Sequence, residues 1–110
     1  MARVPDLVAH LGQATGLPWV WHAHRDAAVL LFGEAIDNGP SGWVPRYTAI
    51  VFCGPELTEW HVDVLAQLER GGQRALRVPG HMSFTQLLEF IALIVERCGG
   101  VSELYSPLNT

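Results

Sequence analysis

The chain has 110 residues, of which 49% are apolar and only 16% are charged, and its 7 basic and 11 acidic residues give a net charge of −4. This composition excludes an intrinsically disordered chain, which combines low hydrophobicity with high net charge. The acidic balance argues against binding to the phosphate backbone of a nucleic acid. We therefore expect a single domain over residues 1–110, with an ordered core from about 5 to 98 and a C-terminal tail from 99 to 110.

The compartment is predicted from what the sequence lacks. No apolar run reaches the roughly 18 residues that a membrane span requires, and the first residues contain no apolar segment typical of a signal peptide. Two cysteines are too few for a disulfide scaffold. We expect a cytoplasmic protein that binds neither membranes nor nucleic acids.

The N-terminal third predicts a helix followed by two strands. Residues 5–14 favour a helix, because proline suits a first turn and the apolar residues recur on one face, and Gly16 ends it. Aromatic and β-branched residues at 19–25 favour a strand, and the apolar segment 27–36 is its returning partner in a hairpin. Gly33 inside that segment predicts a β-bulge.

The middle of the chain predicts a strand, a helix and a short strand after the loop at 37–42. The continuous apolar run at 47–52 is typical of a central strand buried on both faces. One face of the segment 57–70 recurs at helical spacing and is apolar except for His61; its residues are Leu57, Trp60, His61, Val64, Leu65 and Leu68. With a strand at 74–78, this segment predicts a right-handed β-α-β crossover between parallel strands.

A last helix is predicted after Ser83, which forms a capping box with Gln86. Its apolar surface is wider than one stripe and includes Phe90 and Leu93, an excess that suggests either a homodimer face or packing under the first helix. The predicted fold is α+β: a single two-layer sandwich in the order α-β-β-β-α-β-α, with helices packed on a mixed sheet of about four strands.

Three residues of the first hairpin form a candidate metal site. On a strand, His22 and His24 point to the same side, and Asp26 is near enough to join them or to orient a ring. The spelling H-x-H-x-D resembles the metal motif of the metallo-β-lactamase fold over these five residues, with Ala27 where that family has a further histidine. An ordinary solvated hairpin end is the alternative.

Cys53 is the candidate nucleophile. It ends the buried strand, and the N-terminus of the predicted helix would lower its pKa. The string C-G-P-E resembles the C-G-P-C of thioredoxin-like proteins, with Glu56 where the second thiol would stand. The alternative is a small buried cysteine that only packs.

The remaining candidates are apolar binding residues. Trp19 and Trp21 share a strand face and Trp43 borders the glycine-rich loop, so they form either a binding surface or part of the core. The sequence has no lysine and no phosphate-binding or dinucleotide-binding motif, so we expect no cofactor.

Three functions compete. We expect a non-catalytic module that binds a protein partner or a second copy of itself, as an inhibitor, immunity protein or accessory factor does. A thiol-dependent activity at Cys53 and a metal site at His22 and His24 are the alternatives.

Overall fold

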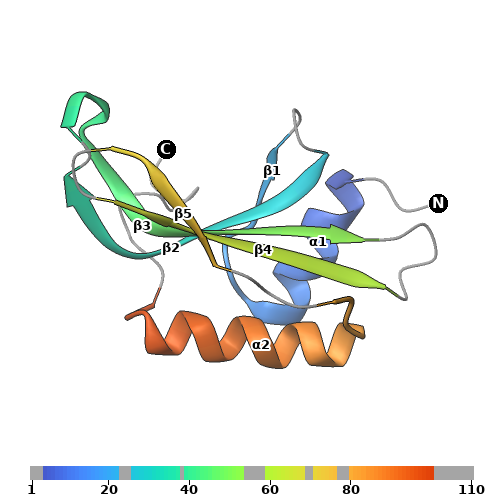
Figure 1. Ribbon diagram of the computed structural model, residues 1–110. Coiled ribbons are helices and arrows are strands. Elements are labelled where there is room, and N and C mark those ends of the chain that lie inside the picture. The colour runs from blue at the N-terminus through green and yellow to red at the C-terminus, as the bar shows by residue number, and fades with distance from the viewer. Residues whose placement is uncertain are drawn as a thin grey trace.

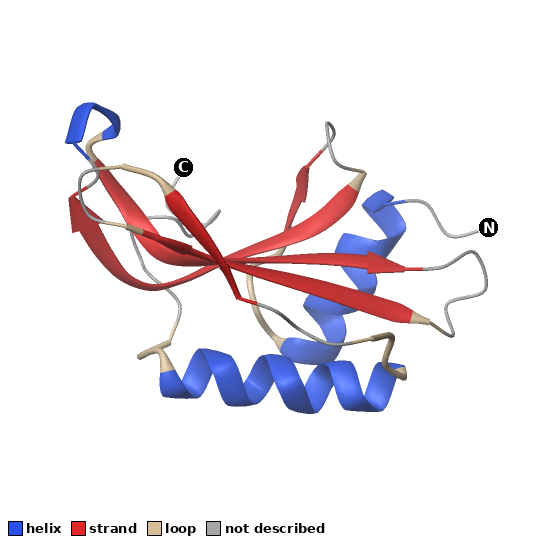
Figure 2. Cartoon of the chain, viewed as in Figure 1, coloured by secondary structure: helices blue, strands red, loops and turns tan. Residues whose placement is uncertain are grey.

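The protein is described here from a computed structural model over residues 4–22, 26–37, 39–53, 59–68, 71–76 and 80–100. In this part of the chain a five-stranded antiparallel sheet, ordered β1-β2-β3-β4-β5, carries both helices on one face (Figures 1 and 2). The predicted α+β class is confirmed. The elements are α1 Val4–Thr15, β1 Val20–His22, β2 Ala27–Asp37, the 3-10 turn Gly39–Ser41, β3 Trp43–Cys53, β4 Trp60–Gln67, β5 Gln73–Leu76 and α2 Phe84–Arg97.

The first helix forms where it was predicted. Leu7 and Leu11 of α1 are buried. The helix ends just before Gly16, which has a φ of 70° and donates its N–H to the carbonyl of Gly12 at 2.9 Å. The last residue of α1, Thr15, accepts a hydrogen bond from the indole N–H of Trp19 at 2.9 Å. This bond satisfies the only polar atom of the indole and lets its rings enter the core.

Strands β2 and β3 form the long hairpin of the sheet. Its pairing shifts between Phe32 and Ala35, and Gly33 has a φ of 86°, so the predicted bulge is confirmed. Strand β3 is buried on both faces, as expected for a central strand: Ala49 and Val51 face the helices, and Ile50 belongs to an apolar cluster on the opposite face.

The predicted helix at 57–70 is wrong, because residues 60–67 form strand β4. Trp60, Val62 and Val64 alternate toward the helices and are all buried, whereas His61 and Asp63 face the other way. The same face had matched a helical period, because residues 60, 64 and 68 fit both the roughly 3.6-residue repeat of a helix and the two-residue repeat of a strand. Pairing with β3 decides the outcome, since it gives that strand a hydrogen-bonded neighbour on its second edge and suits the two β-branched valines.

This correction changes the topology of the sheet. Within the described ranges no β-α-β crossover forms. They contain five antiparallel strands instead of about four mixed ones, in the order α-β-β-β-β-β-α. The predicted strand at 74–78 corresponds to β5, whose four residues are all exposed at the edge of the sheet. Residues 77–79 lie outside the described part of the chain.

The capping box of α2 is present as predicted. The Ser83 hydroxyl accepts from the backbone N–H of Gln86 at 3.2 Å, and the Gln86 side chain accepts from the backbone N–H of Ser83 at 2.9 Å. Leu87, Ile91 and Val95 form the buried stripe of the helix. No helix in the described residues is long and apolar enough to cross a membrane.

Trp60 lies at the centre of the main core. Its rings lie 5.0 Å from those of Phe84, and its backbone exchanges hydrogen bonds of 2.9 and 2.8 Å with Met82. The core cluster extends from Trp60 to both helices and to β2 and β3. The Trp60 side chain of β4 therefore packs against the helical layer, in which the segment 57–70 was itself expected to form a helix.

Replacing Trp60 by alanine is expected to lower the free energy of unfolding by about 3–5 kcal/mol, since a fully buried aromatic side chain is lost from the core. Urea unfolding followed by circular dichroism measures the change. Trp43→Ala is the matched control, because its side chain is 65% exposed and the loss there should stay within about 0.5 kcal/mol. Equal losses in the two variants would contradict the packing described here.

Candidate functional site

The end of the β2–β3 hairpin lies on the side of the molecule where α2 ends (Figure 1). Residues of these elements line two hollows. They share Glu34 and Arg46, whose side chains form an ion pair at 3.4 Å. The first hollow, of about 500 Å³, is lined by residues of the hairpin turn, and the second, of about 660 Å³, is lined by residues at the end of α2. We call them the turn hollow and the helix hollow.

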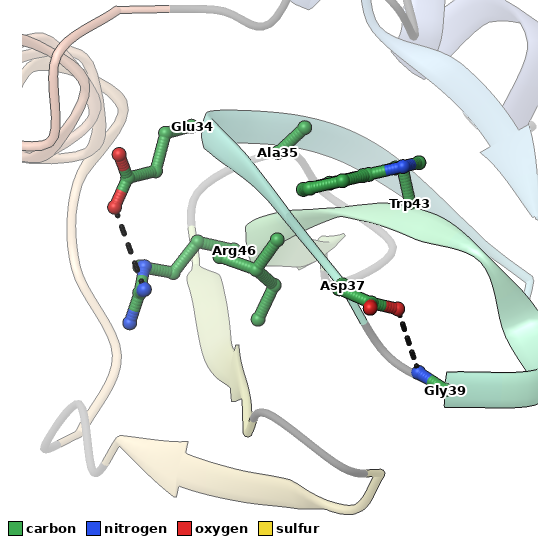
Figure 3. Close-up of a pocket in the computed structure, with 7 residues that line it drawn as sticks. Glu34, Ala35, Asp37, Gly39, Trp43 and Arg46 are labelled. Atoms are coloured by element: carbon green, nitrogen blue, oxygen red, sulfur yellow. Dashed lines mark hydrogen bonds and ion pairs between the residues drawn. The ribbon is translucent and has the colours of Figure 1, made fainter.

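The turn hollow is built by the end of the hairpin. The Asp37 carboxylate accepts the backbone N–H of Gly39 at 3.0 Å, which fixes the turn locally (Figure 3). Trp43 stands opposite Asp37 in the register, and its indole lies beside Ala35 at the mouth of the hollow. The largest aromatic side chain therefore borders a polar depression and stays 65% exposed.

The helix hollow is built where the bulge meets the end of α2. The N–H of Gly33 donates to the carbonyl of Gly100 at 2.9 Å, which joins β2 to the residues that follow α2. A Cβ atom on Gly33 would lie 2.7 Å from Cδ2 of Tyr47, so the tyrosine ring occupies the space that any other residue would need. Tyr47, Arg97 and Cys98 complete the lining.

The ion pair between the hollows is weak by its geometry. One guanidinium nitrogen of Arg46 reaches one Glu34 oxygen at 3.4 Å, and the glutamate side chain is 75% exposed. Exposed pairs of this kind contribute roughly 0–1 kcal/mol. Within the described residues, the buried Nε of Arg46 has no hydrogen-bond partner. Arg46 therefore retains donor capacity beyond its contact with Glu34.

Cys98 lies in the helix hollow as a protonated thiol. Burial raises the pKa of this thiol, while a hydrogen bond from the Tyr47 hydroxyl lowers it by a smaller amount. A thiol with a raised pKa is a poor nucleophile at neutral pH. The residue therefore contributes packing and a polarizable wall.

The predicted apolar binding residues divide into core and surface. Trp19 is 5% exposed and belongs to the main core, and Phe90 is half-buried against that core. Trp21 on the edge strand β1, Trp43 at the hairpin end and Leu93 on the outer face of α2 are exposed. Of these side chains, only Trp43 borders one of the two hollows.

The predicted reactivity of Cys53 depended on a helix that begins directly after it. Cys53 is the last residue of β3, where it lies opposite Trp60, and it is half-buried. Residues 60–67 of the predicted helix form strand β4, and residues 54–58, where that helix was expected to begin, lie outside the described part of the chain. The helix dipole that was to lower the thiol pKa is therefore not supplied by residues 60–67.

The structure describes only two of the three residues of the candidate metal site. His22 is exposed on β1, Asp26 has a left-handed backbone with a φ of 54°, and His24 lies outside the described residues. Among the residues that the structure describes, no group of three His, Cys, Asp or Glu side chains is placed to hold a metal ion. His61 instead pairs with Asp63 at 3.0 Å on β4.

The residues of the helix hollow were missed by the sequence analysis. The bulge and the register of the hairpin bring Glu34, Arg46 and Tyr47 together, and no local sequence pattern predicts that they lie close in space. The signal that could have found them is the lysine-free composition, which makes each arginine noteworthy. Comparison of the chain with protein-family models, with curated proteins and with solved structures finds no match.

Gly33→Ala is expected to lower the free energy of unfolding by about 3 kcal/mol, because it combines a left-handed backbone with the overlap on the Tyr47 ring. Gly39→Ala, at a φ of 65° with open space around it, should cost only about 1 kcal/mol. Urea unfolding of both variants makes the comparison. If Gly39→Ala proved the more damaging of the two, the close approach of Tyr47 to the bulge would be refuted.

The thiol of Cys98 is expected to ionise at a higher pH than a free cysteine, because burial disfavours the thiolate. The ultraviolet absorbance of the thiolate, followed against pH in a Cys53→Ser background, gives the midpoint, and the urea-unfolded chain gives the reference. Tyr47→Phe should move the midpoint further upward, since it removes the hydroxyl that stabilises the thiolate. A midpoint at or below the unfolded value would contradict the assignment.

Proposed function

We propose that the protein is a non-catalytic protein-binding module whose contact surface is the end of the β2–β3 hairpin, centred on Trp43. The observation that carries this proposal is the 65% exposure of the Trp43 side chain at the mouth of the turn hollow. Exposing a tryptophan to this extent keeps a large apolar area in water, and tryptophan is the residue type most enriched at the energetic centres of protein interfaces.

The surroundings of Trp43 support the same function. The backbone of the turn is held by the Asp37–Gly39 hydrogen bond and by a bond of 2.9 Å from the Gly42 N–H to the Gly39 carbonyl. A contact surface of fixed shape loses less conformational entropy on binding than a loose one. Arg46 and Glu34, at the inner edge of the hollow, add charged groups that can select a partner by complementarity.

A second copy of the chain is one form that the partner could take. The sequence suggested the flank of the last helix with Phe90 and Leu93, and in the structure Leu93 is 47% exposed while Phe90 packs partly against the core. The hairpin end offers the larger exposed aromatic surface and the adjacent hollows, so it is the better-supported contact surface.

Selection from a displayed peptide library on the immobilised protein tests the proposal. Enriched peptides should bind the wild type and Leu93→Ala alike, and Trp43→Ala should weaken them by roughly 30-fold or more, the loss typical of an interface hot spot. Peptides that bind Trp43→Ala as well as the wild type, or a selection that enriches none, would refute the hairpin end as a binding surface. Light scattering over a concentration series, on the wild type and Trp43→Ala, shows in parallel whether a second copy occupies it.

A further inference from the structure

The helix hollow gathers positive charge in a protein that is acidic overall. The sequence contains seven arginines, no lysine and a net charge of −4. Three of those arginines lie in the described residues, Arg46, Arg74 and Arg97, and two of them line this one hollow. The third, on the edge strand β5, lines neither hollow.

The chemistry of the lining favours an anion that carries a single charge. The residues that line the hollow include two arginines and one glutamate, Glu34, so the lining residues together carry one net positive charge. Arginine presents its N–H groups as a planar fork that matches the two oxygens of a carboxylate. The remaining polar groups are the Tyr47 hydroxyl and the protonated thiol of Cys98, which add no negative charge at neutral pH.

Arg46 can turn toward such an anion at low cost. Its guanidinium extends toward Glu34 across the edge of the hairpin (Figure 3), in a single contact of 3.4 Å with an exposed partner. Its Nε has no partner within the described residues, so its present position leaves one buried donor unsatisfied. A carboxylate that bridges Arg46 and Arg97 would replace one weak pair by two charge-assisted contacts.

We propose that the helix hollow is a carboxylate-binding subsite, in which Arg46 and Arg97 hold an acidic side chain or the C-terminal carboxylate of a bound peptide and Glu34 competes with that ligand for Arg46. The subsite rests on the proposed function for its biological role. The two hollows share Glu34 and Arg46, so the subsite adjoins the surface around Trp43.

Small blocked peptides test the subsite without any knowledge of the natural partner. The probes are a tripeptide with a central glutamate and both ends blocked, its glutamine analogue, a triglycine with a free carboxyl terminus, and inorganic phosphate. The side-chain Nε–H signals of the arginines are followed by nuclear magnetic resonance during each titration. We expect the Arg46 and Arg97 signals to shift saturably with the glutamate peptide or the free terminus, with a dissociation constant on the order of millimolar, while the Arg74 signal stays in place.

Three variants sharpen the result. Arg97→Gln should weaken carboxylate binding roughly tenfold, whereas Arg74→Gln, the matched control, should leave it unchanged. Glu34→Gln should strengthen binding by roughly two- to fivefold, because the competing carboxylate is removed. A gain of affinity at this position is not expected from a residue that only supports the fold.

The outcomes separate this inference from the proposed function. Equal shifts at Arg74, binding of the glutamine analogue, no shift at all, or tighter binding of phosphate than of either carboxylate would overturn the subsite. If the peptide selection succeeds while these titrations fail, only the subsite falls. If the titrations succeed while the selection enriches nothing, the Trp43 surface falls and the carboxylate subsite stands.

Discussion

Burial of Trp60 is the interaction on which the architecture depends. The indole faces away from the neighbouring histidine and aspartate of β4, contacts Phe84 at the start of α2, and lies 6.3 Å from the ring of His10 on α1. Its backbone pairs with Cys53 on one side and with Met82 on the other. One residue therefore links the sheet to both helices, and burying its large apolar surface holds residues 60–67 extended.

Local signals were enough to predict some of the elements. The capping box at Ser83 and Gln86, the stop at Gly16 and the bulge at Gly33 each depend on the conformational preferences of one or two residues, and all three are confirmed. The segment 60–67 could not be predicted in this way. Its apolar residues fit two periods, and the choice between them is made by a neighbouring strand and a tryptophan pocket that are distant in sequence.

Of the candidate site, the sequence predicted only Trp43. Trp43 was named because a tryptophan beside a glycine-rich loop is conspicuous, yet residues 43–46 were not assigned to a strand. Without the extension of β3 to Trp43, nothing places Arg46 across from Glu34. Arg97 arrives from the opposite end of the chain, because α2 packs under the sheet and the Gly33–Gly100 hydrogen bond fixes its end. Because the pocket is lined by three separate segments, the sequence of any one of them alone does not predict it.

The next-neighbour order of the strands has a kinetic consequence. Every strand of the sheet pairs with the one that directly precedes it along the chain, so each pairing closes a short loop and loses little chain entropy. The sheet can therefore grow one hairpin at a time. Contact between α1 and α2 instead joins the two ends of the described chain, so it is the step with the largest entropic barrier. Docking of the last helix onto a sheet that already exists is the order of folding events that this topology favours.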